Sequence, residues 1–305
     1  MTAKNILHML TPHRHVSPFD VNMAADAGFD VIVPYENVTL DEVGDLVQDA
    51  MFSRPPHDGA STAIFFGGDD AVLALDMIDA AKKARVSPFG THAFADPQGS
   101  FTTAAAMVAC TEKVLKEKKN QDLKGTRIAV FGATGVVGYC AAVIAALEGA
   151  KVTLVGHSGL ERVKARADEM KQRFGVDVAA VNGASDAEKA DVLAETEVVF
   201  AAAKAGVRVL TTALLAGAPK LLAAADVNAV PPSGIEGIDV FDLGKEIAGT
   251  ETHGIGALGI GALAIGNVKY QTESGLFKRM IASDEVLVLD FRDAFTLART
   301  LVPDL

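Results

Sequence analysis

The sequence predicts a two-domain α/β protein with a parallel sheet in each domain. From residue 4 to about residue 119, short β-rich runs alternate with longer segments of helical period. A polar and charged stretch at 111–125 separates this half from a second one, which opens with a strand, a glycine-rich turn and a helix. Alternation of strands and helices is typical of parallel sheets with crossover helices.

Four strands are expected in the first half, which we assign to an α/β domain over residues 1–120. Each strand precedes a helix candidate, and the strands are NILHML, VIVPY, TAIFFG and THAFAD. The functional loops of a parallel sheet gather at the carboxyl ends of its strands. We therefore expect the chemistry of this domain in the stretches TPHRHVSPFD, FFGGDD and ADPQGSFTT.

The second domain is expected over residues 121–274 as a doubly wound sheet. Its strands are expected at RIAVF, KVTLV, VDVAAV, TEVVFAAA and KLLAAADVN. The glycine-dense stretch 252–267 is expected to form a small-residue helix or turn. An amphipathic helix near the carboxyl end is expected to pack back on the first domain, so that residues 275–305 complete it.

Composition favours a cytoplasmic protein that acts on a small molecule. The 28 basic and 39 acidic residues give a net charge of −11, and no basic run offers a nucleic-acid footprint. No stretch approaches the roughly twenty apolar residues that span a bilayer, and the first residues do not resemble an export signal. The two cysteines, Cys110 and Cys140, lie in apolar surroundings and form neither a disulfide framework nor zinc-ligand spacing.

The glycine-rich turn predicts a Rossmann-type domain that binds NAD or NADP. Its residues are Gly132, Ala133, Thr134, Gly135, Val136, Val137 and Gly138, between a strand and an apolar helix. Alanine stands at the first glycine position of the usual G-x-G-x-x-G pattern. We expect Gly135 to admit the pyrophosphate and Gly138 to allow close helix packing. A plain glycine turn in a parallel sheet is the alternative.

The end of the second strand bears on the choice of nucleotide. NAD-selective proteins place Asp or Glu there to bind the ribose diol, whereas this chain has Gly156. Nothing at that position would repel a 2′-phosphate, and His157, Ser158 and Arg162 are close enough in sequence to bind it. We expect NADP to be accepted and NAD to serve as well. A solvated Arg162 on the next helix is the alternative.

Four further stretches point to a known family. SPFD (17–20), GSFTTAAA (99–106), ADVNAVPPSGIEGID (225–239) and GNVKYQ (266–271) resemble the methylene-tetrahydromethanopterin dehydrogenases of methylotrophic bacteria. The ending LVGHS of the second strand resembles the branch that uses either NAD or NADP more than the NADP-only branch, which has Gly-Arg there. The resemblance implies a homo-oligomer, with a trimer as one candidate.

The resemblance also implies the reaction. A hydride would pass from methylene-tetrahydromethanopterin to NAD(P)⁺, giving methenyl-tetrahydromethanopterin and NAD(P)H in one-carbon metabolism, in the oxidation of formaldehyde. The methenyl cation is delocalised over two pterin nitrogens, so the hydride step needs no general base and depends mainly on orientation. The sequence accordingly shows no Ser-His-Asp, Cys-His or paired-carboxylate set.

Several residues are assigned to the site from their positions in these stretches. Asp20 and Lys269 are the catalytic candidates, Ser17, Phe19, Thr102, Thr103 and Asp226 are expected to bind substrate, and Asn228 is expected to contact the cofactor. Four of them have a named structural alternative: Asp20 as a first-turn helix acid, the two threonines as cap or first-turn residues, and Lys269 as a solvated lysine. For Lys269 the register is open, because the active-site lysine of the NADP-only branch aligns opposite Ala264.

We expect no metal. His8, His13 and His15 lie near one strand end, but no carboxylate or cysteine completes a ligand set at suitable spacing. Contacts from His13 and Arg14 to phosphate or another polar part of the substrate fit better. Two other functions stay open: another two-domain dehydrogenase of the shikimate or amino-acid type, which would need a proton relay, and a non-catalytic NAD(P) sensor, which would need no second ligand site.

Overall fold

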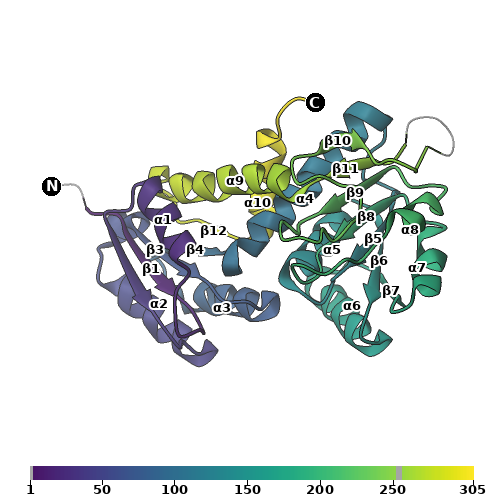
Figure 1. The fold of residues 1–305 in the computed structure, drawn as a ribbon. Coiled ribbons are helices and arrows are strands. Elements are labelled where there is room, and N and C mark those ends of the chain that lie inside the picture. Colours follow the sequence, from purple (N-terminus) through teal and green to yellow (C-terminus); the bar gives the residue numbers. More distant parts are fainter. Residues whose placement is uncertain (1–2, 252–255) are drawn as a thin grey trace. The chain divides into compact units, whose positions relative to one another are not determined.

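The computed structural model describes residues 3–251 and 256–305. Its contacts divide the chain into two compact units. The first unit comprises Met1–Thr102 and Tyr270–Leu297, and the second comprises Thr103–Lys269 and Ala298–Leu305. Figure 1 shows both units along the chain. The boundaries at 120 and 274 that we assigned from the sequence remain predictions.

The first unit contains a five-stranded parallel sheet. Its strands are β1 (Ile6–Leu10), β2 (Val31–Tyr35), β3 (Thr62–Phe66), β4 (His92–Ala95) and β12 (Val288–Leu289), in the order β12-β4-β3-β1-β2. The four strands expected from the alternating pattern are confirmed. The fifth, β12, comes from the carboxyl-terminal part of the chain, and the amide of Leu287 beside it donates to Nδ1 of His92 at 2.9 Å.

The helices that follow these strands are α1 (Pro18–Ala27), α2 (Val43–Phe52), α3 (Ala71–Ala84) and α4 (Ser100–Val114), with short 3₁₀ turns at Leu40–Glu42, Pro56–Ser61 and Pro97–Gly99. Helices α1 to α3 connect β1 to β4 in turn, and α4 follows β4 and belongs to the second unit from Thr103 on. Helix α1 starts with a serine cap and a proline, and it ends at Gly28, whose φ of 111° favours glycine. Helix α3 is capped by Asp70, whose carboxylate accepts the amide of Leu73.

Aromatic side chains form the centre of the first unit. Phe277 of α9 (Ala262–Ala282) contacts Phe65 of β3 and Phe94 of β4, with ring centroids 5.6 and 5.4 Å apart. Phe101 meets Phe291 edge to face at 5.4 Å. All five rings are almost completely buried, and burying a phenylalanine contributes about 1.5–3 kcal/mol. Residues from the end of the chain therefore complete this core, as we expected for the carboxyl-terminal helix α10 (Phe291–Leu301).

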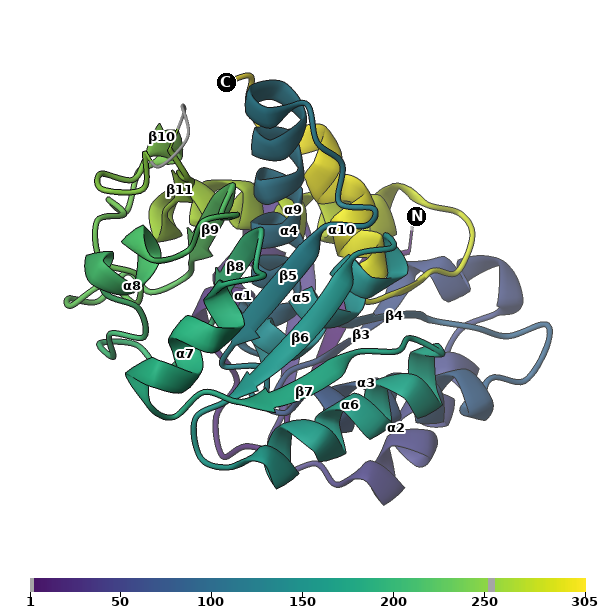
Figure 2. The same cartoon turned by 90° about the vertical axis from the view of Figure 1, so that its right-hand side faces the viewer.

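The second unit is a doubly wound sheet of seven strands, visible in Figure 2. The strands are β5 (Arg127–Phe131), β6 (Lys151–Gly156), β7 (Ala179–Asn182), β8 (Val198–Ala201), β9 (Ala223–Asp226), β10 (Leu243–Glu246) and β11 (Leu258–Ile260), in the order β10-β11-β9-β8-β5-β6-β7. Only the β10–β11 pairing is antiparallel among these strands. The connecting helices are α5 (Val136–Leu147), α6 (Leu160–Phe174), α7 (Asp186–Leu193) and α8 (Thr212–Ala216).

The glycine-dense stretch 252–267 contains the expected helix only in its last residues, because a strand precedes it. Residues 252–255 lie outside the described part of the chain, 258–260 form strand β11, and α9 begins at residue 262. Strand β11 pairs with β9 as the next parallel strand of the sheet. A side chain on Gly259 would lie 3.2 Å from Ile238, so the small residues here allow a loop to cover the strand closely.

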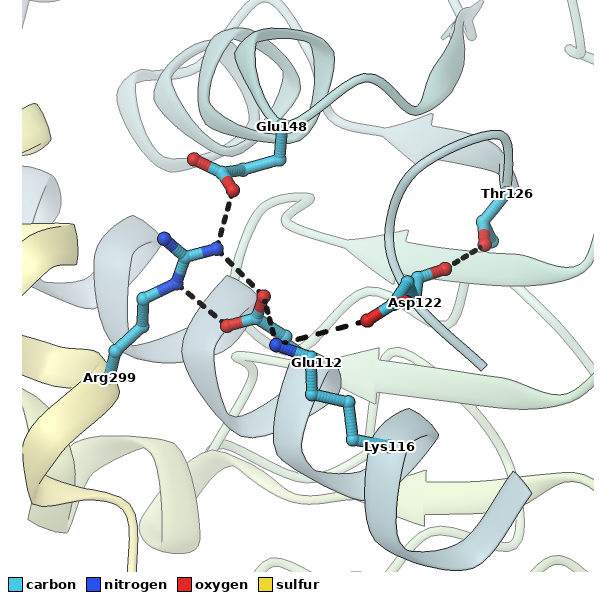
Figure 3. Close-up of polar contacts among 6 residues, drawn as sticks. All are labelled: Glu112, Lys116, Asp122, Thr126, Glu148 and Arg299. Atoms are coloured by element: carbon cyan, nitrogen blue, oxygen red, sulfur yellow. Dashed lines mark hydrogen bonds and ion pairs between the residues drawn. The ribbon is translucent and has the colours of Figure 1, made fainter. Parts of the chain in front are cut away.

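The last turn of α10, from Ala298 on, belongs to the second unit and forms ion pairs within it, shown in Figure 3. The guanidinium of Arg299 donates from Nε and Nη2 to the two carboxylate oxygens of Glu112, both at 2.7 Å, and Nη2 also bonds Glu148. Lys116 donates to Glu112 at 3.1 Å. Burial alone would raise the pKa of Glu112, but the bonds from Arg299 and Lys116 more than offset this, so its pKa lies below the usual value.

Candidate functional site

The turn between β5 and α5 uses each of its three glycines differently. Gly132 has a φ of 82°, and a Cβ atom there would lie 2.3 Å from the carbonyl oxygen of Ala202. A Cβ atom on Gly138 would lie 2.5 Å from the carbonyl oxygen of Gly132. The fold therefore requires glycine at both positions. Gly132, rather than Ala133, makes the tight turn that the first glycine of the usual pattern provides.

Gly135 differs, because the fold itself has little need of a glycine there. Its φ is −84°, and a Cβ atom would approach only the carbonyl oxygen of Gly132, at 3.4 Å. Gly135 is also the N-cap of α5, and no side chain caps the amides of the first turn. A glycine in this place leaves the amides open to a ligand that approaches closely. An anionic group such as a pyrophosphate fits this helix end.

Two cavities adjoin the glycine turn. The smaller, of about 60 Å³, is lined by the turn and by Gly156, His157, Ser158, Gly159 and Arg162. The larger, of about 360 Å³, has apolar walls that include Phe131, Val207 and Val209. Gly132, Val155 and His157 line both cavities. The larger volume and its apolar walls suit a planar base, and the smaller cavity suits a ribose or phosphate beside it.

A third cavity, of about 660 Å³, lies at the other end of the strands. It is lined by the first residues of β5, β6 and β7, such as Arg127 and Lys151, and by side chains of α7. Although it is larger, it lies away from the glycine turn and at the amino ends of the strands. Ligands of doubly wound sheets bind at the carboxyl ends, so we place the site at the two smaller cavities.

The absence of a carboxylate at the end of β6 has a steric reason. A Cβ atom on Gly156 would lie 2.8 Å from the carbonyl oxygen of Gly159 and 3.0 Å from Val163. An aspartate or glutamate could occupy this position only if the 157–159 turn moved. The turn that brings His157 and Ser158 to the smaller cavity therefore excludes the acid that NAD-selective proteins place here.

A buried tyrosine, which no sequence pattern pointed to, joins the two helices beside this site. The hydroxyl of Tyr139 on α5 donates to Glu169 on α6, and Glu169 also accepts from Arg173 at 3.0 Å. Burial and the bond to Glu169 raise the pKa of Tyr139, so the phenol stays protonated and remains a donor. The link holds α5 against α6, the helix on which Arg162 lies.

Asp226 and Asn228 hold the loop that follows β9. The carboxylate of Asp226 accepts the amides of Asn228 at 3.0 Å and Ile235 at 2.9 Å, and burial raises its pKa although these amides oppose the rise. The side chain of Asn228 accepts the amide of Gly206 and donates to the carbonyl of Pro232. These bonds account for both polar side chains without a ligand. The substrate and cofactor roles that we expected for them remain predictions.

At the starts of α1 and α4, Ser17 caps its helix, whereas Thr102 bonds the carboxylate that accepts the first amides of α4. The Ser17 hydroxyl accepts the amide of Asp20, at 3.4 Å, at the start of α1. The Thr102 hydroxyl donates to the buried carboxylate of Asp96 at 2.6 Å, and Asp96 also accepts the amides of Phe101 and Thr102. We had not singled out Asp96, which lies in the stretch ADPQGSFTT. Thr103 is half-buried on the next position of α4.

The catalytic candidates and Phe19 differ in exposure. Asp20 is 1% exposed and Lys269 is 9% exposed, so Lys269 does not fit the alternative of a solvated surface lysine. Phe19, next to Asp20 in the first turn of α1, is 46% exposed. A large aromatic ring left open to solvent at the carboxyl end of a parallel sheet is suited to stacking on a planar ligand.

The histidines near the first strand end have separate partners. His8 contacts the hydroxyl of Tyr35 at 3.0 Å, His13 lies 3.0 Å from Asp69, and His15 lies 3.6 Å from Glu36. In the part of the chain that the structure describes, no three His, Cys, Asp or Glu side chains are grouped as a metal site would require.

No helix within residues 3–251 and 256–305 has the length and apolar character needed to cross a bilayer.

Comparisons of the sequence with known proteins found related dehydrogenases. Residues 18–98 match the family described as methylene-tetrahydromethanopterin dehydrogenase, N-terminal. The chain is 55% identical to the NAD(P)-dependent methylenetetrahydromethanopterin dehydrogenase of Methylorubrum extorquens, over 97% of this chain and 98% of that protein. It is 35% identical to the bifunctional protein MdtA of the same organism, over 83% of this chain and 86% of that protein.

Among solved structures, the shikimate 5-dehydrogenase of Listeria monocytogenes in complex with shikimate and NAD is similar at a TM-score of 0.48. It shares 14% identity over 90% of this chain and 92% of that chain. The identity of 55% over nearly the whole length of both chains decides the family. This chain belongs to the methylene-tetrahydromethanopterin dehydrogenases.

Proposed function

We propose that this protein oxidises methylene-tetrahydromethanopterin with NAD(P)⁺ as hydride acceptor. The observation that carries the proposal is the near full-length similarity to a relative named for this reaction, combined with a glycine turn shaped for a dinucleotide. When bound, the nicotinamide accepts a hydride from the pterin methylene carbon. One C–H bond breaks with both its electrons, and the products are the methenyl cation and NAD(P)H.

The chain's own residues bind and orient the dinucleotide. The open amides of the first turn of α5 and the bare backbone of Gly135 receive the pyrophosphate. The apolar cavity lined by Phe131 and Val207 receives the adenine, and His157 borders the ribose. No acid excludes a 2′-phosphate, because Gly156 has no room for a side chain. These features support the use of both NAD and NADP.

The pterin is bound by residues at the starts of α1 and α4. The exposed ring of Phe19 stacks on the planar pterin, and the buried carboxylate of Asp20 faces the positive charge that develops as the hydride leaves. The bond from Thr102 to Asp96 fixes the start of α4, where Thr103 adds a polar contact. The hydride step releases no proton. Reacting atoms must lie within about 3–3.5 Å, so the contribution of these residues is orientation and charge stabilisation.

Lys269 is proposed as the second catalytic group. It is largely buried on α9, and the fully buried Glu273 follows one helical turn later. Side chains four residues apart on a helix are neighbours, so Glu273 lies where it can keep the ammonium group charged and oriented. Replacing Lys269 by Met should lower kcat more than tenfold with little change in the KM for NADP. An unchanged kcat would remove Lys269 from the mechanism.

The decisive experiment mixes the purified protein with methylene-tetrahydromethanopterin and either NADP or NAD. Formation of methenyl-tetrahydromethanopterin is followed by absorbance, and NAD(P)H is measured separately in a one-to-one ratio. Methylene-tetrahydrofolate in place of the pterin tests whether the second carrier is accepted. No methenyl product with either nucleotide would refute the proposed function.

A cytoplasmic location and a homo-oligomeric state are also proposed for this chain. They fit the family and a place in the one-carbon metabolism of a methylotroph. Sedimentation at several protein concentrations would decide the oligomeric state, and a monomer at all concentrations would contradict it.

A further inference from the structure

Four basic side chains line the two cavities beside the glycine turn, although the chain as a whole has a net charge of −11. Arg162 lines the smaller cavity, and Lys189, Lys204 and Arg208 line the larger one. No aspartate or glutamate is among the residues that line either cavity in the described part of the chain. This local excess of positive charge complements a ligand with more negative charge than a pyrophosphate alone.

Two of these four basic side chains already bind other groups of the protein. Lys189 donates to the carbonyl of Val209 at 2.9 Å and pairs with Asp186. Arg208 pairs with Glu236 at 2.6 Å. Arg162 and Lys204 are exposed, and neither side chain forms a hydrogen bond or ion pair with other residues that the structure describes. Their charges are therefore available to a ligand.

The loop that contains Lys204 is held against the glycine turn. A Cβ atom on Gly132 would lie within 2.6 Å of the backbone of Ala202 and Ala203, so the two segments are in close contact. The next part of the loop is fixed by the amide of Gly206, which donates to Asn228 at 3.2 Å. The backbone is thus anchored on both sides of Lys204, and its long side chain is free to turn toward the cavity.

We propose that Lys204 and Arg162 together form a clamp for the 2′-phosphate of NADP, in which Lys204 is a specificity-determining residue that the sequence pattern does not reveal. The inference rests on the proposed use of NAD(P). The two cavities meet at His157, and the residue at the end of the second strand borders the adenosine ribose. Arg162 approaches this point from the smaller cavity and Lys204 from the larger.

The chemistry of the pair agrees with the acceptance of both nucleotides. A lysine ammonium is a point charge on a flexible stem, whereas an arginine fork binds a phosphate through two parallel hydrogen bonds. Neither group needs the 2′-phosphate for its own stability, because both are solvated when the ligand lacks it. NAD therefore loses two favourable contacts but meets no unpaired buried charge.

The test compares adenosine 2′,5′-bisphosphate with 5′-AMP, two probes that differ only in the 2′-phosphate. The chain has no tryptophan, so binding is measured by calorimetry. The variants are Lys204→Gln and Arg162→Gln. The matched control is Lys151→Gln, which removes the same charge from an exposed lysine at the opposite end of β6, roughly 16 Å along the strand.

Each site variant should weaken binding of the bisphosphate about tenfold and leave binding of 5′-AMP within about twofold, while the control changes neither. Raising the salt concentration should weaken binding of the bisphosphate less in the variants than in the wild type. Equal losses for both probes would place Lys204 on another phosphate and overturn the clamp. No loss with Lys204→Gln would overturn it as well.

The outcome is separable from that of the dehydrogenase assay. A wild-type protein that distinguishes the two probes but forms no methenyl product would refute the proposed reaction and leave the clamp in place. A protein that forms the product, but whose Lys204→Gln variant keeps the wild-type ratio of kcat/KM for NADP over NAD, would refute the clamp and leave the reaction in place.

Discussion

Gly138 lies so close to the carbonyl of Gly132 that a single added carbon would come within 2.5 Å of its oxygen. The first turn of α5 thus rests directly on the turn that leaves β5. Gly135, between them in sequence, has no comparable contact, because its nearest neighbour would be 3.4 Å away. One glycine is needed by the fold, and the other is needed by a ligand. This difference can be tested.

Replacing Gly138 by Ala should destabilise the protein, whereas replacing Gly135 by Ala should not. The added methyl at 138 overlaps backbone that cannot move away, which costs about 1–3 kcal/mol in the free energy of unfolding. Gly135→Ala should change that free energy by less than about 0.5 kcal/mol but weaken NADP binding about tenfold or more. Denaturant titrations followed by circular dichroism and calorimetry with NADP measure the two effects. Equal destabilisation by both substitutions would contradict the assignment.

Introducing an acid at Gly156 should not convert the protein to an NAD-selective form. The Cβ atom would meet the carbonyl oxygen of Gly159 at 2.8 Å, so Gly156→Asp is expected to cost about 1–3 kcal/mol of stability and to disturb binding of both nucleotides. The matched variant is Ser158→Asp, because this exposed residue lines the same cavity. Ser158→Asp should keep the wild-type stability and weaken binding of adenosine 2′,5′-bisphosphate about tenfold relative to binding of 5′-AMP. Improved NAD affinity in a stable Gly156→Asp protein would refute the steric argument.

The Arg299–Glu112 pair should stabilise the protein at neutral pH and lose this effect in acid. Glu112 is almost buried, so Arg299→Met leaves it with Lys116 alone and should cost about 2–3 kcal/mol. The pKa of Glu112 is lower in the folded than in the unfolded protein, so its contribution is present above the unfolded pKa, about 4.3, and is lost as the pH falls through the folded pKa.

The difference in unfolding free energy between wild type and Arg299→Met should therefore be largest near pH 7 and shrink below about pH 4. Lys113→Gln is the control, since it breaks the pair with the fully exposed Asp304 on the same carboxyl-terminal segment. Its effect should stay below about 1 kcal/mol. A difference for Arg299→Met that is independent of pH would mean that packing, and not the ion pair, holds this segment.

Phe19→Ala should raise the KM for the pterin several-fold without loss of stability. The ring is 46% exposed, so its removal leaves no cavity in the core, but it takes away a surface for stacking. Phe52→Ala, which removes a ring that is 51% exposed on α2, serves as control and should leave the KM unchanged. Steady-state kinetics at saturating NADP gives both values. An unchanged KM for Phe19→Ala would remove Phe19 from the pterin site.

Much of the fold was predictable because strand and helix periods alternate clearly in this chain. The nine predicted strands match β1 to β9, with boundaries that differ by a few residues. Strand β12 has only two residues and could not be recognised, since no alternation exists over so short a run. Strand β11, with the residues LGI, was hidden in a glycine-dense stretch whose composition suggests a turn.

Parts of the candidate site were predictable where a sequence pattern indicates a single structure. They were less predictable where the same pattern fits either a ligand contact or a bond within a loop. The glycine turn and the open end of β6 follow from spacing and strand context. Asp226 and Asn228 illustrate the other case, because a polar residue after a strand serves a ligand or its own loop equally well, and here both side chains bond the loop. Lys204 is a lone lysine among alanines and a glycine, so only its place beside the cavity distinguishes it.

The first unit is built from two separate stretches of chain. It therefore cannot complete its fold when only its amino-terminal stretch has left the ribosome. Phe65 and Phe94 emerge early, but Phe277, which covers both rings, is made only after the whole nucleotide-binding sheet has been translated. The nascent amino-terminal half must therefore wait with apolar surface uncovered, a condition in which chains are prone to aggregate or to engage chaperones. If translation stops late, before Phe277 is made, the first unit should therefore remain unfolded although most of its residues have been synthesised.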